Sequence, residues 1–413
     1  MMYRAIFTFI ASLVILSSPA QPHLLEKKLD NLSNQLITNN EVAGINVLLI
    51  KDGKILYNKA FGYADVGTQQ PLQTNHIFRI ASQTKAITSV AVMMLWEEGR
   101  FLLDDPISKY IPAFKSPKVL DQFNAADSSY TTVPAKKEIT IRDLLRHTSG
   151  IGYPTITDDN RIQAIYTKSG VLSGIGSKAQ LKDQIAMLAK MPLLHQPGDR
   201  FTYGLNTDVL GYLIEGVSGL PLDSFFHKRI FEPLEMNDTY FTIPQTKADR
   251  LVSVSKKTVN GFGKVNNTVY ENSPVNYPLQ KGIVLSGGAG LSSTTADYAI
   301  FLQMLLNKGI YKGKRILGSK TIELITTNQL SESVISKGDA DFRFGLGFCL
   351  VTDDNRFSHS ENTGTFYWGG AFNTHYWADP KRNTIGLVFT QEYLPASYWD
   401  LGTLYKNVFY SSF

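Results

Sequence analysis

Cysteine is almost absent from this chain of 413 residues, which contains Cys349 and no other. A single cysteine excludes an internal disulfide and any metal site built from several thiolates. Cys349 lies in the apolar stretch 344–350, where a buried structural thiol is the expected role. The H-E-x-x-H pattern of zinc hydrolases and the phosphate-binding P-loop are also missing. The sequence therefore predicts no metal, no nucleotide and no other cofactor.

Long apolar runs and clusters of one charge are also scarce. The net charge of +5 is small and no basic run gathers on one face, which argues against a nucleic-acid partner. The one apolar run follows Arg4 and covers 5–16, and the small residues S-P-A at 18–20 resemble a cleavage site. The run is too short to span a bilayer comfortably, and polar residues follow at once, so we expect no stable membrane anchor. We expect 1–20 to be a signal peptide cleaved near Ala20, and the mature protein to be periplasmic or secreted.

Residues rich in β-branched and aromatic side chains predict sheet at both ends of the mature chain, 21–413. The first such segments surround Asp52-Gly53, the two-residue signal of a tight hairpin, so we expect the mature protein to begin with sheet. Apolar residues at helical spacing between 401 and 408 predict a closing helix. The predicted strands are 45–51, 54–63, 344–350, 374–378 and 384–390.

The middle of the chain is predicted to be mainly helical, from Asp105 to about Gly219. Thr140 and Asp143 have the spacing of a capping box at the start of a helix. A longer helix is predicted over 207–217, and Gly219 is its natural terminator.

Sheet at both ends with helices between them predicts two lobes. One α/β lobe is formed by the two ends of the chain, about 24–104 and 281–413. A mainly helical lobe, about 105–236, is inserted into it, while the polar, turn-rich segment 237–280 permits no assignment. Clefts that bind ligands commonly lie at such junctions, so we expect the functional site there.

Ser82 stands at the predicted start of a helix that is apolar nearly all round, and Lys85 follows one turn later. A serine hydroxyl is a weak nucleophile until a base takes its proton, and a lysine can be that base when its surroundings keep it neutral. The spacing alone is a weak signal, because Ser253 and Lys256 repeat it in a polar segment. A capping serine with an outward-pointing lysine explains the spacing alone more simply. The helix start adds free N–H groups and a positive dipole end, which can stabilise an oxyanion.

The residues around this pair resemble those of the serine β-lactamase and D-alanyl-D-alanine peptidase superfamily, in its class C-like branch that includes W-G-G esterases. The resemblance covers nearly the whole mature chain and rests on six ordered segments. They are FRIASQTK at 78–85, LLDDP at 102–106, TIRDLLRHTSG at 140–150, FTYGLNTDVLG at 201–211, GAGLSSTTAD at 288–297 and WGGAFNTHYWADP at 368–380. The resemblance implies a β-lactamase/transpeptidase-like α/β fold, an antiparallel sheet flanked by helices with the active site at the lobe junction.

By this resemblance, the second motif of the family, usually Y-x-N, begins at Tyr203, which would share the base role with lysine or pass the proton to the leaving group. Leu205 replaces the usual asparagine and Asn206 follows it; both are expected at the substrate-binding site, although the replacement removes the customary side-chain amide from its usual position. His147 lies in the family phrase at a helix end, where a structural role is expected.

The third motif, usually K-T-G or H-x-G, falls on Trp368, Gly369 and Gly370, which would bind substrate along the cleft. The resemblance implies that the N–H of Ala371 joins that of Ser82 as the oxyanion hole. Paired glycines permit close approach to a ligand, although a bulge or turn also explains them.

The change from a cation to Trp368 bears on the substrate. A lysine or histidine there would meet the carboxylate of a β-lactam or of a peptide C-terminus, whereas indole offers an apolar face and one N–H. The substitution favours neutral esters, unless Arg343 or Lys381 supplies a cation from elsewhere. Asn373 stands where the family more often has glycine, a change that the sequence does not explain.

The sequence thus predicts an exported serine hydrolase that cleaves ester, or possibly amide, bonds through an acyl-enzyme on Ser82. Its partner would be a small-molecule ester, amide or β-lactam. A class C-like β-lactamase or D-alanyl-D-alanine carboxypeptidase is the alternative. A non-catalytic binding or assembly protein of the same fold is the third interpretation.

Overall fold

The computed structural model describes residues 20–157, 159–335, 341–396 and 398–412. The expected signal peptide therefore lies outside the described residues, except for Ala20. Among the helices of the described ranges, none combines the length and the apolar character that a membrane crossing requires.

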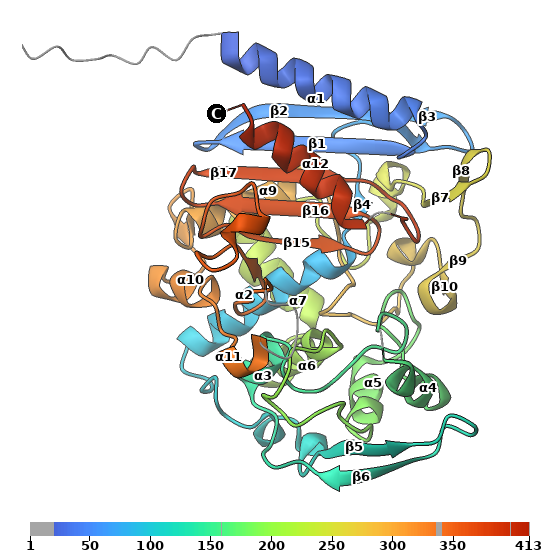
Figure 1. Ribbon diagram of the computed structural model, residues 1–413, viewed down its shortest axis with the longest axis vertical. Helices are drawn as coiled ribbons and strands as arrows, with labels where there is room; N and C mark the ends of the chain where they lie inside the picture. The colour runs from blue at the N-terminus through green and yellow to red at the C-terminus, as the bar shows by residue number, and fades with distance from the viewer. Residues whose placement is uncertain (1–19, 158, 336–340, 397, 413) are drawn as a thin grey trace, which may run out of the picture.

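A seven-stranded antiparallel sheet joins the two ends of the chain (Figure 1). Its order is β14-β15-β16-β17-β1-β2-β3, so that β1 pairs with β17 at its centre. Asp52 and Gly53 close the predicted hairpin with φ of 52° and 72°, as a two-residue turn requires. The strands are β1 (Gly44–Lys51), β2 (Lys54–Asp65), β3 (Gln70–Pro71), β14 (Cys349–Leu350), β15 (Phe366–Gly370), β16 (Thr374–Asp379) and β17 (Thr384–Phe389).

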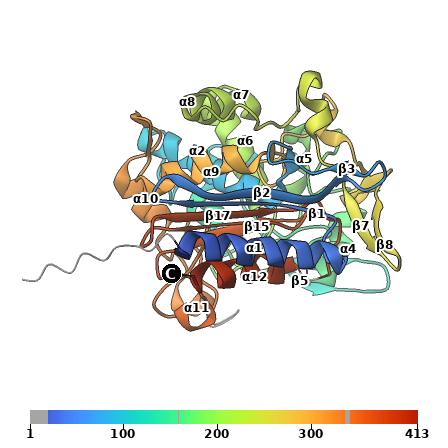
Figure 2. The ribbon, with the colours of Figure 1, turned by 90° about the horizontal axis from the view of Figure 1, so that it is seen from above.

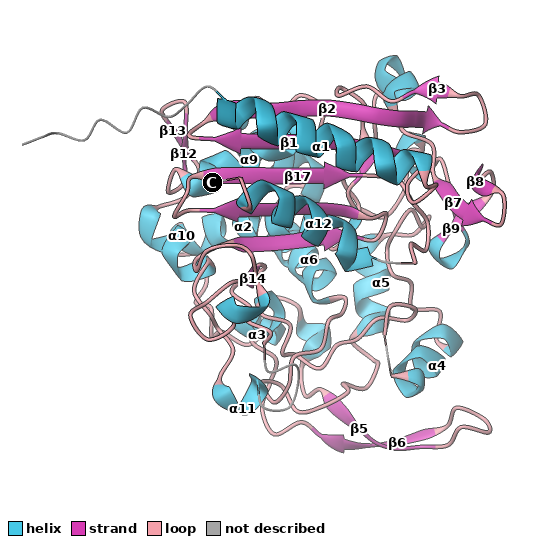
Figure 3. Ribbon diagram, turned by 45° about the horizontal axis from the view of Figure 1, so that its top comes forward, coloured by secondary structure: helices cyan, strands magenta, loops and turns pink. Residues whose placement is uncertain are grey.

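Helices cover both faces of this sheet (Figures 2 and 3). Helices α1 (Ala20–Thr38) and α12 (Tyr398–Tyr410) lie on one face, and α2 (Thr84–Glu97) and α9 (Thr295–Leu306) lie on the other. The closing helix is therefore confirmed. The expectation that the mature chain begins with sheet is wrong, because α1 precedes β1. Leu25, Leu29 and Leu36 recur at helical spacing and are buried against the sheet.

The middle of the chain carries short helices and one hairpin. The capping box of Thr140 and Asp143 is present, and Gly219, with φ of 72°, ends α6 as predicted. The hairpin of β5 (Lys118–Phe123) and β6 (Tyr130–Pro134) was not expected in this segment. The helices are α3 (Ile141–Leu145), α4 (Asn160–Lys168), α5 (Leu181–Leu188), α6 (Asn206–Ser218), α7 (Leu222–Phe226) and α8 (Glu232–Leu234).

Small elements complete the chain. The segment 237–280, which the sequence left unassigned, holds two short hairpins separated by turns. The predicted strand 344–350 is reduced to Cys349–Leu350, because Gly347 has φ of 99° and the chain turns there to pass Ser89. The remaining elements are β4 (Phe78–Arg79), β7 (Ser255–Thr258), β8 (Gly261–Lys264), β9 (Thr268–Val269), β10 (Ser273–Pro274), β11 (Ser292–Ser293), β12 (Ile310–Tyr311), β13 (Lys314–Arg315), α10 (Ser319–Ile325) and α11 (Glu332–Ile335).

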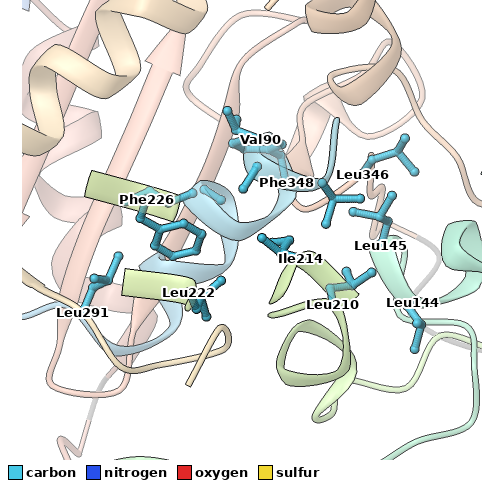
Figure 4. Packing of buried hydrophobic residues seen from close by; sticks show 14 of the residues in the cluster. Val90, Leu144, Leu145, Leu210, Ile214, Leu222, Phe226, Leu291, Leu346 and Phe348 are labelled. Atoms are coloured by element: carbon cyan, nitrogen blue, oxygen red, sulfur yellow. The ribbon is translucent and has the colours of Figure 1, made fainter. Parts of the chain in front are cut away.

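The largest hydrophobic cluster surrounds α2 and binds the helical segment to the sheet. Every residue of α2 from Thr84 to Leu95 is buried, which confirms the apolar character predicted for it. Figure 4 shows side chains of α3, α6 and α7 converging on this helix, with Leu346 and Phe348 packed from the C-terminal part of the chain. The residues that immediately precede α2 are therefore held by the core.

Candidate active site

Ser82 lies in a 3₁₀ turn, Ala81–Gln83, that leads directly into α2. The regular α-helix begins at Thr84, two residues later than the sequence predicts. The residue before the serine, Ala81, is fully buried and has φ of 40°, a left-handed conformation that costs a residue with a side chain about 1–3 kcal/mol. This turn directs Ser82 out of the core, where its side chain is half-buried at the wall of a cavity.

Lys85 lies under Ser82 and is only 2% exposed. Its Nζ is 3.4 Å from Ser82 Oγ, and it donates to the Tyr153 hydroxyl at 3.0 Å and to the Gly288 carbonyl at 2.8 Å. These partners are neutral oxygens. Burial rules out the outward-pointing lysine of the simpler interpretation, and the short distance to Ser82 places an amine where it can take the hydroxyl proton.

Tyr153 is a site residue that the sequence analysis missed. It is buried, it accepts a hydrogen bond from Lys85, and its ring lies 5.4 Å from that of Tyr203. It belongs to an irregular loop between α3 and α4, so neither periodicity nor spacing pointed to it. Its phenol extends the hydrogen-bond network of the lysine into the helical segment.

Tyr203 contacts both Lys85 and Tyr153. Lys85 Nζ lies 4.6 Å from the centroid of its ring, and the Trp368 indole N–H donates to its hydroxyl at 3.4 Å. Gly204 lets the chain pass here, because a Cβ on that residue would lie 2.0 Å from the carbonyl oxygen of Ile151. The structure thus brings Tyr203, Lys85 and Ser82 together, as the resemblance implied.

Leu205 and Asn206 do not join them. Leu205 is 3% exposed and Asn206 is fully buried at the start of α6. The Asn206 amide donates to His147 Nδ1 at 2.9 Å and accepts from the Ser149 hydroxyl, so its polar atoms are satisfied inside the protein. Both side chains therefore face the core, so the expected contact of Leu205 and Asn206 with substrate is not made by their side chains in this structure.

His147 has a structural role in this arrangement. Its ring is buried 5.0 Å from the ring of Tyr203 and contacts Phe201 and Phe344. Burial, together with the nearby charge of Lys85, holds the pKa of His147 well below its usual value, so the imidazole is neutral near pH 7. His147 supports the wall on which Tyr203 stands.

Asp208 is hydrogen-bonded to Gly288, the main-chain partner of Lys85. This carboxyl is fully buried and accepts hydrogen bonds from the Ser286 hydroxyl at 2.5 Å and from the N–H of Gly288 at 3.3 Å. Burial raises the pKa of Asp208 above its usual value. Asp208 thus holds the N–H of Gly288, the residue whose carbonyl accepts from Lys85.

Strand β15 delivers Ala371 to the other side of Ser82. A Cβ on Gly370 would lie 2.1 Å from the carbonyl oxygen of Ile80, so β15 can approach the serine turn this closely only with glycine. Gly369 is buried beside it, whereas Trp368, Ala371 and Ser82 all line one cavity. The backbone of Ala371 is thereby placed beside the serine.

The sequence model of the beta-lactamase family matches residues 29–406. The chain belongs to the beta-lactamase family. The prediction from the six segments is confirmed, and the antiparallel sheet with flanking helices is the β-lactamase/transpeptidase fold.

Relatives of this beta-lactamase family protein carry several different names. Protein Rv1367c of Mycobacterium tuberculosis is 32% identical over 364 residues, which cover 85% of this chain and 86% of the relative. The putative D-alanyl-D-alanine carboxypeptidase of Escherichia coli K12 is 29% identical, covering 80% and 74%. Esterase EstB of Burkholderia gladioli is 26% identical, covering 89% and 90%.

Solved structures place the fold firmly. EstCE1, described as a hydrolase with promiscuous acyltransferase activity, superimposes with a TM-score of 0.82 at 25% identity, covering 95% of this chain and all of the other. The simvastatin synthase LovD from Aspergillus terreus has a TM-score of 0.78 at 23% identity, covering 95% and 98%, and shows the fold alone.

Asn373, the departure from the family that the sequence did not explain, occupies the turn between β15 and β16. Its φ is 63°, in the left-handed region that glycine and asparagine tolerate best. Its buried amide donates to the Glu392 carboxyl at 3.2 Å and accepts from His375 Nε2 at 2.8 Å. Asparagine thus keeps the conformation of a glycine and adds two hydrogen bonds beneath the turn.

The cavity beside Ser82 has a volume of about 690 Å³ and walls that are mostly apolar. Arg343 is buried 3.7 Å from Asp354, and Lys381 lies in the turn between β16 and β17, at the far end of the strand from Ala371. Within the described ranges no group of three or more metal-binding side chains is present. The cavity is lined by Ser82, Thr155, Ile156, Tyr203, Tyr270, Trp368, Ala371, Tyr393, Leu394 and Pro395. None of these side chains carries a charge.

Proposed function

We propose that this protein is a serine hydrolase that cleaves uncharged esters through an acyl-enzyme on Ser82. The observation that carries the proposal is the buried Lys85, whose Nζ reaches Ser82 Oγ at 3.4 Å at the wall of an uncharged, aromatic cavity. A buried lysine with neutral partners is costly to keep for packing alone. Its position is that of a general base for the serine.

The reaction proceeds by two acyl transfers. Ser82 Oγ attacks the ester carbonyl while Lys85, assisted by Tyr203, takes the hydroxyl proton. The N–H groups of Ser82 and Ala371 stabilise the oxyanion, whose collapse expels the alcohol together with the proton that Tyr203 or Lys85 returns to it. Water then attacks the acyl carbonyl, gives its proton to the same base and releases the acid. The proton held by that base finally returns to Ser82.

The walls of the cavity favour an uncharged substrate with apolar groups. Trp368 presents an indole where a carboxylate-binding cation would stand, and it is itself hydrogen-bonded to Tyr203. The relative named esterase EstB and the fold neighbour EstCE1 support this choice. The relatives named putative D-alanyl-D-alanine carboxypeptidases support the alternative, a peptidase or β-lactamase whose substrate carries a carboxylate.

The deciding experiment uses the mature chain, residues 21–413, with p-nitrophenyl esters of increasing acyl length and with nitrocefin. We expect ester turnover to exceed nitrocefin turnover, and intact-mass analysis to detect an acyl adduct that Ser82→Ala abolishes. Ser253→Ala is the matched control, because Ser253 opens the second S-x-x-K of the chain and instead donates to Asp65. It should leave turnover unchanged.

Three outcomes would contradict the proposal. Near-normal ester turnover in Ser82→Ala would show that Ser82 is not the nucleophile. Faster turnover of nitrocefin than of every ester would favour the β-lactamase alternative. A folded protein that forms no adduct with a fluorophosphonate or penicillin probe would favour a non-catalytic role.

We further propose export, on the strength of residues 1–20. The mature protein isolated from the periplasm or medium of the producing cell should begin after Ala20. Recovery of the uncleaved chain in the cytoplasm would refute this.

A further inference from the structure

In the turn after β15, the carbonyls of Gly370, Ala371 and Phe372 all accept hydrogen bonds, and one of the donors comes from a segment that the sequence left unassigned. The N–H of Asn373 donates to the carbonyl of Gly370 at 2.9 Å, which closes a tight turn around Ala371 and Phe372. The carbonyl of Phe372 accepts from the N–H of Glu392 at 3.0 Å and from the Thr390 hydroxyl at 3.1 Å. These bonds hold the turn from its two ends.

The carbonyl between them, that of Ala371, accepts from the hydroxyl of Tyr270 at 2.8 Å. Tyr270 begins the 3₁₀ turn Tyr270–Asn272 between β9 and β10, about one hundred residues before its partner in the chain. Burial, with a smaller contribution from the neighbouring Tyr393, raises the pKa of Tyr270, so the phenol keeps its proton and donates it. Tyr270 thus lines the cavity and at the same time donates a hydrogen bond to the turn.

The ring of Tyr270 is fixed as firmly as its hydroxyl. It packs edge-on against Phe372 at 5.6 Å and against Tyr393 at 5.0 Å between ring centroids. Val269, the residue before it, is buried in the same hydrophobic cluster as Ala81 and Phe372, the neighbours of Ser82 and Ala371. A rotation of the peptide that joins Ala371 to Phe372 would therefore have to break a hydrogen bond whose donor cannot follow.

We propose that Tyr270 is a positioning residue for the oxyanion hole. Its hydroxyl holds the carbonyl of Ala371 and thereby restrains the ψ torsion of Ala371, the residue whose own N–H faces the carbonyl oxygen of the substrate. A group that acts in this way stabilises the oxyanion of the transition state and not the bound ester. This role rests on the proposed function, since it requires an acyl-enzyme on Ser82.

Tyr270→Phe tests the role, because it keeps the ring contacts and removes only the hydroxyl. We expect kcat to fall about tenfold, the effect of one well-placed hydrogen bond, while KM changes less than twofold and the melting temperature stays within about 2 °C. Tyr240→Phe is the matched control, since the Tyr240 hydroxyl also donates to a main-chain carbonyl, that of Asn237, away from the cavity. It should leave kcat unchanged.

A transition-state mimic separates positioning from a merely structural role. A trifluoromethyl ketone adds to a nucleophilic serine and forms an oxyanion, whereas the matching methyl ketone binds without this step. Tyr270→Phe should weaken inhibition by the trifluoromethyl ketone by the same factor as kcat and leave binding of the methyl ketone unchanged. Equal weakening of both inhibitors, or kcat within twofold of wild type, would overturn the role of Tyr270. Absence of Ser82-dependent turnover in the wild type would instead remove the proposed function, and this role with it.

Discussion

Gly370→Ala is the sharpest test of how the site is assembled. The added Cβ would lie 2.1 Å from the carbonyl oxygen of Ile80 and 2.5 Å from the Thr374 hydroxyl, well inside the 3.0 Å that such contacts tolerate. Because Ile80 presents backbone, which cannot rotate away, β15 has to move by about 1 Å from the serine turn. A displacement of this size at a reacting centre costs about 100-fold in rate, and overpacking costs about 1–3 kcal/mol of stability.

The assay measures kcat on a p-nitrophenyl ester, the amplitude of the acylation burst and the free energy of unfolding in urea. Gly216→Ala in α6 is the control, because an added Cβ there meets nothing within 4 Å. It should raise stability by about 0.5–1 kcal/mol and leave kcat unchanged. If Gly370→Ala folds and keeps kcat within threefold of wild type, Ala371 does not contribute to the reaction in the way we describe.

Two further predictions concern pH and specificity. Burial raises the pKa of Asp297 to about 6, so the native protein holds this proton to a higher pH than the unfolded chain does, and stability from this group is lost as the pH rises from about 4 to 6. Asp297→Asn should remove that loss. In urea titrations, the unfolding free energy of wild type relative to Asp297→Asn should therefore fall by up to about 3 kcal/mol between pH 4 and pH 7. Parallel pH profiles of the two proteins would contradict this prediction. Trp368→Lys should favour an ester with a terminal carboxylate over an uncharged ester of equal length, and the ratio of their kcat/KM values should rise about tenfold. An unchanged ratio would show that Trp368 does not decide charge selectivity.

Local pattern predicted much of the fold. The Asp52-Gly53 turn, the buried helix α2 and the end of α6 at Gly219 follow from turn chemistry and periodicity, which act over a few residues. Helix α1 was not predicted, because its few leucines, Leu25 and Leu29 among them, are spread among polar residues and give only a weak periodic signal. The β5–β6 hairpin has both strands largely exposed, so it shows no alternation of buried and exposed residues to detect.

Residues of the candidate site that belong to family motifs were predicted from the sequence, whereas those that lie in irregular loops were not. Ser82, Tyr203, Trp368 and Ala371 come from distant segments and line one cavity. Tyr153 and Tyr270 lie in irregular loops, where only the folded backbone decides which side chain reaches the lysine or the turn. The Leu205–Asn206 expectation is incorrect because the start of α6 turns its amide toward His147.

The pairing of β1 with β17 has a consequence for the order in which this protein can mature. Strand β1 is synthesised before its central partner β17, which lies more than three hundred residues later in the sequence. Ser82 is likewise made long before Ala371. Until β15, β16 and β17 have been synthesised, β1 lacks its central partner and the turn that carries Ala371 is absent, so we expect a shorter chain to be neither folded nor active. We expect a chain that stops after α11 to retain Ser82 and Lys85 in its sequence and to show no hydrolase activity.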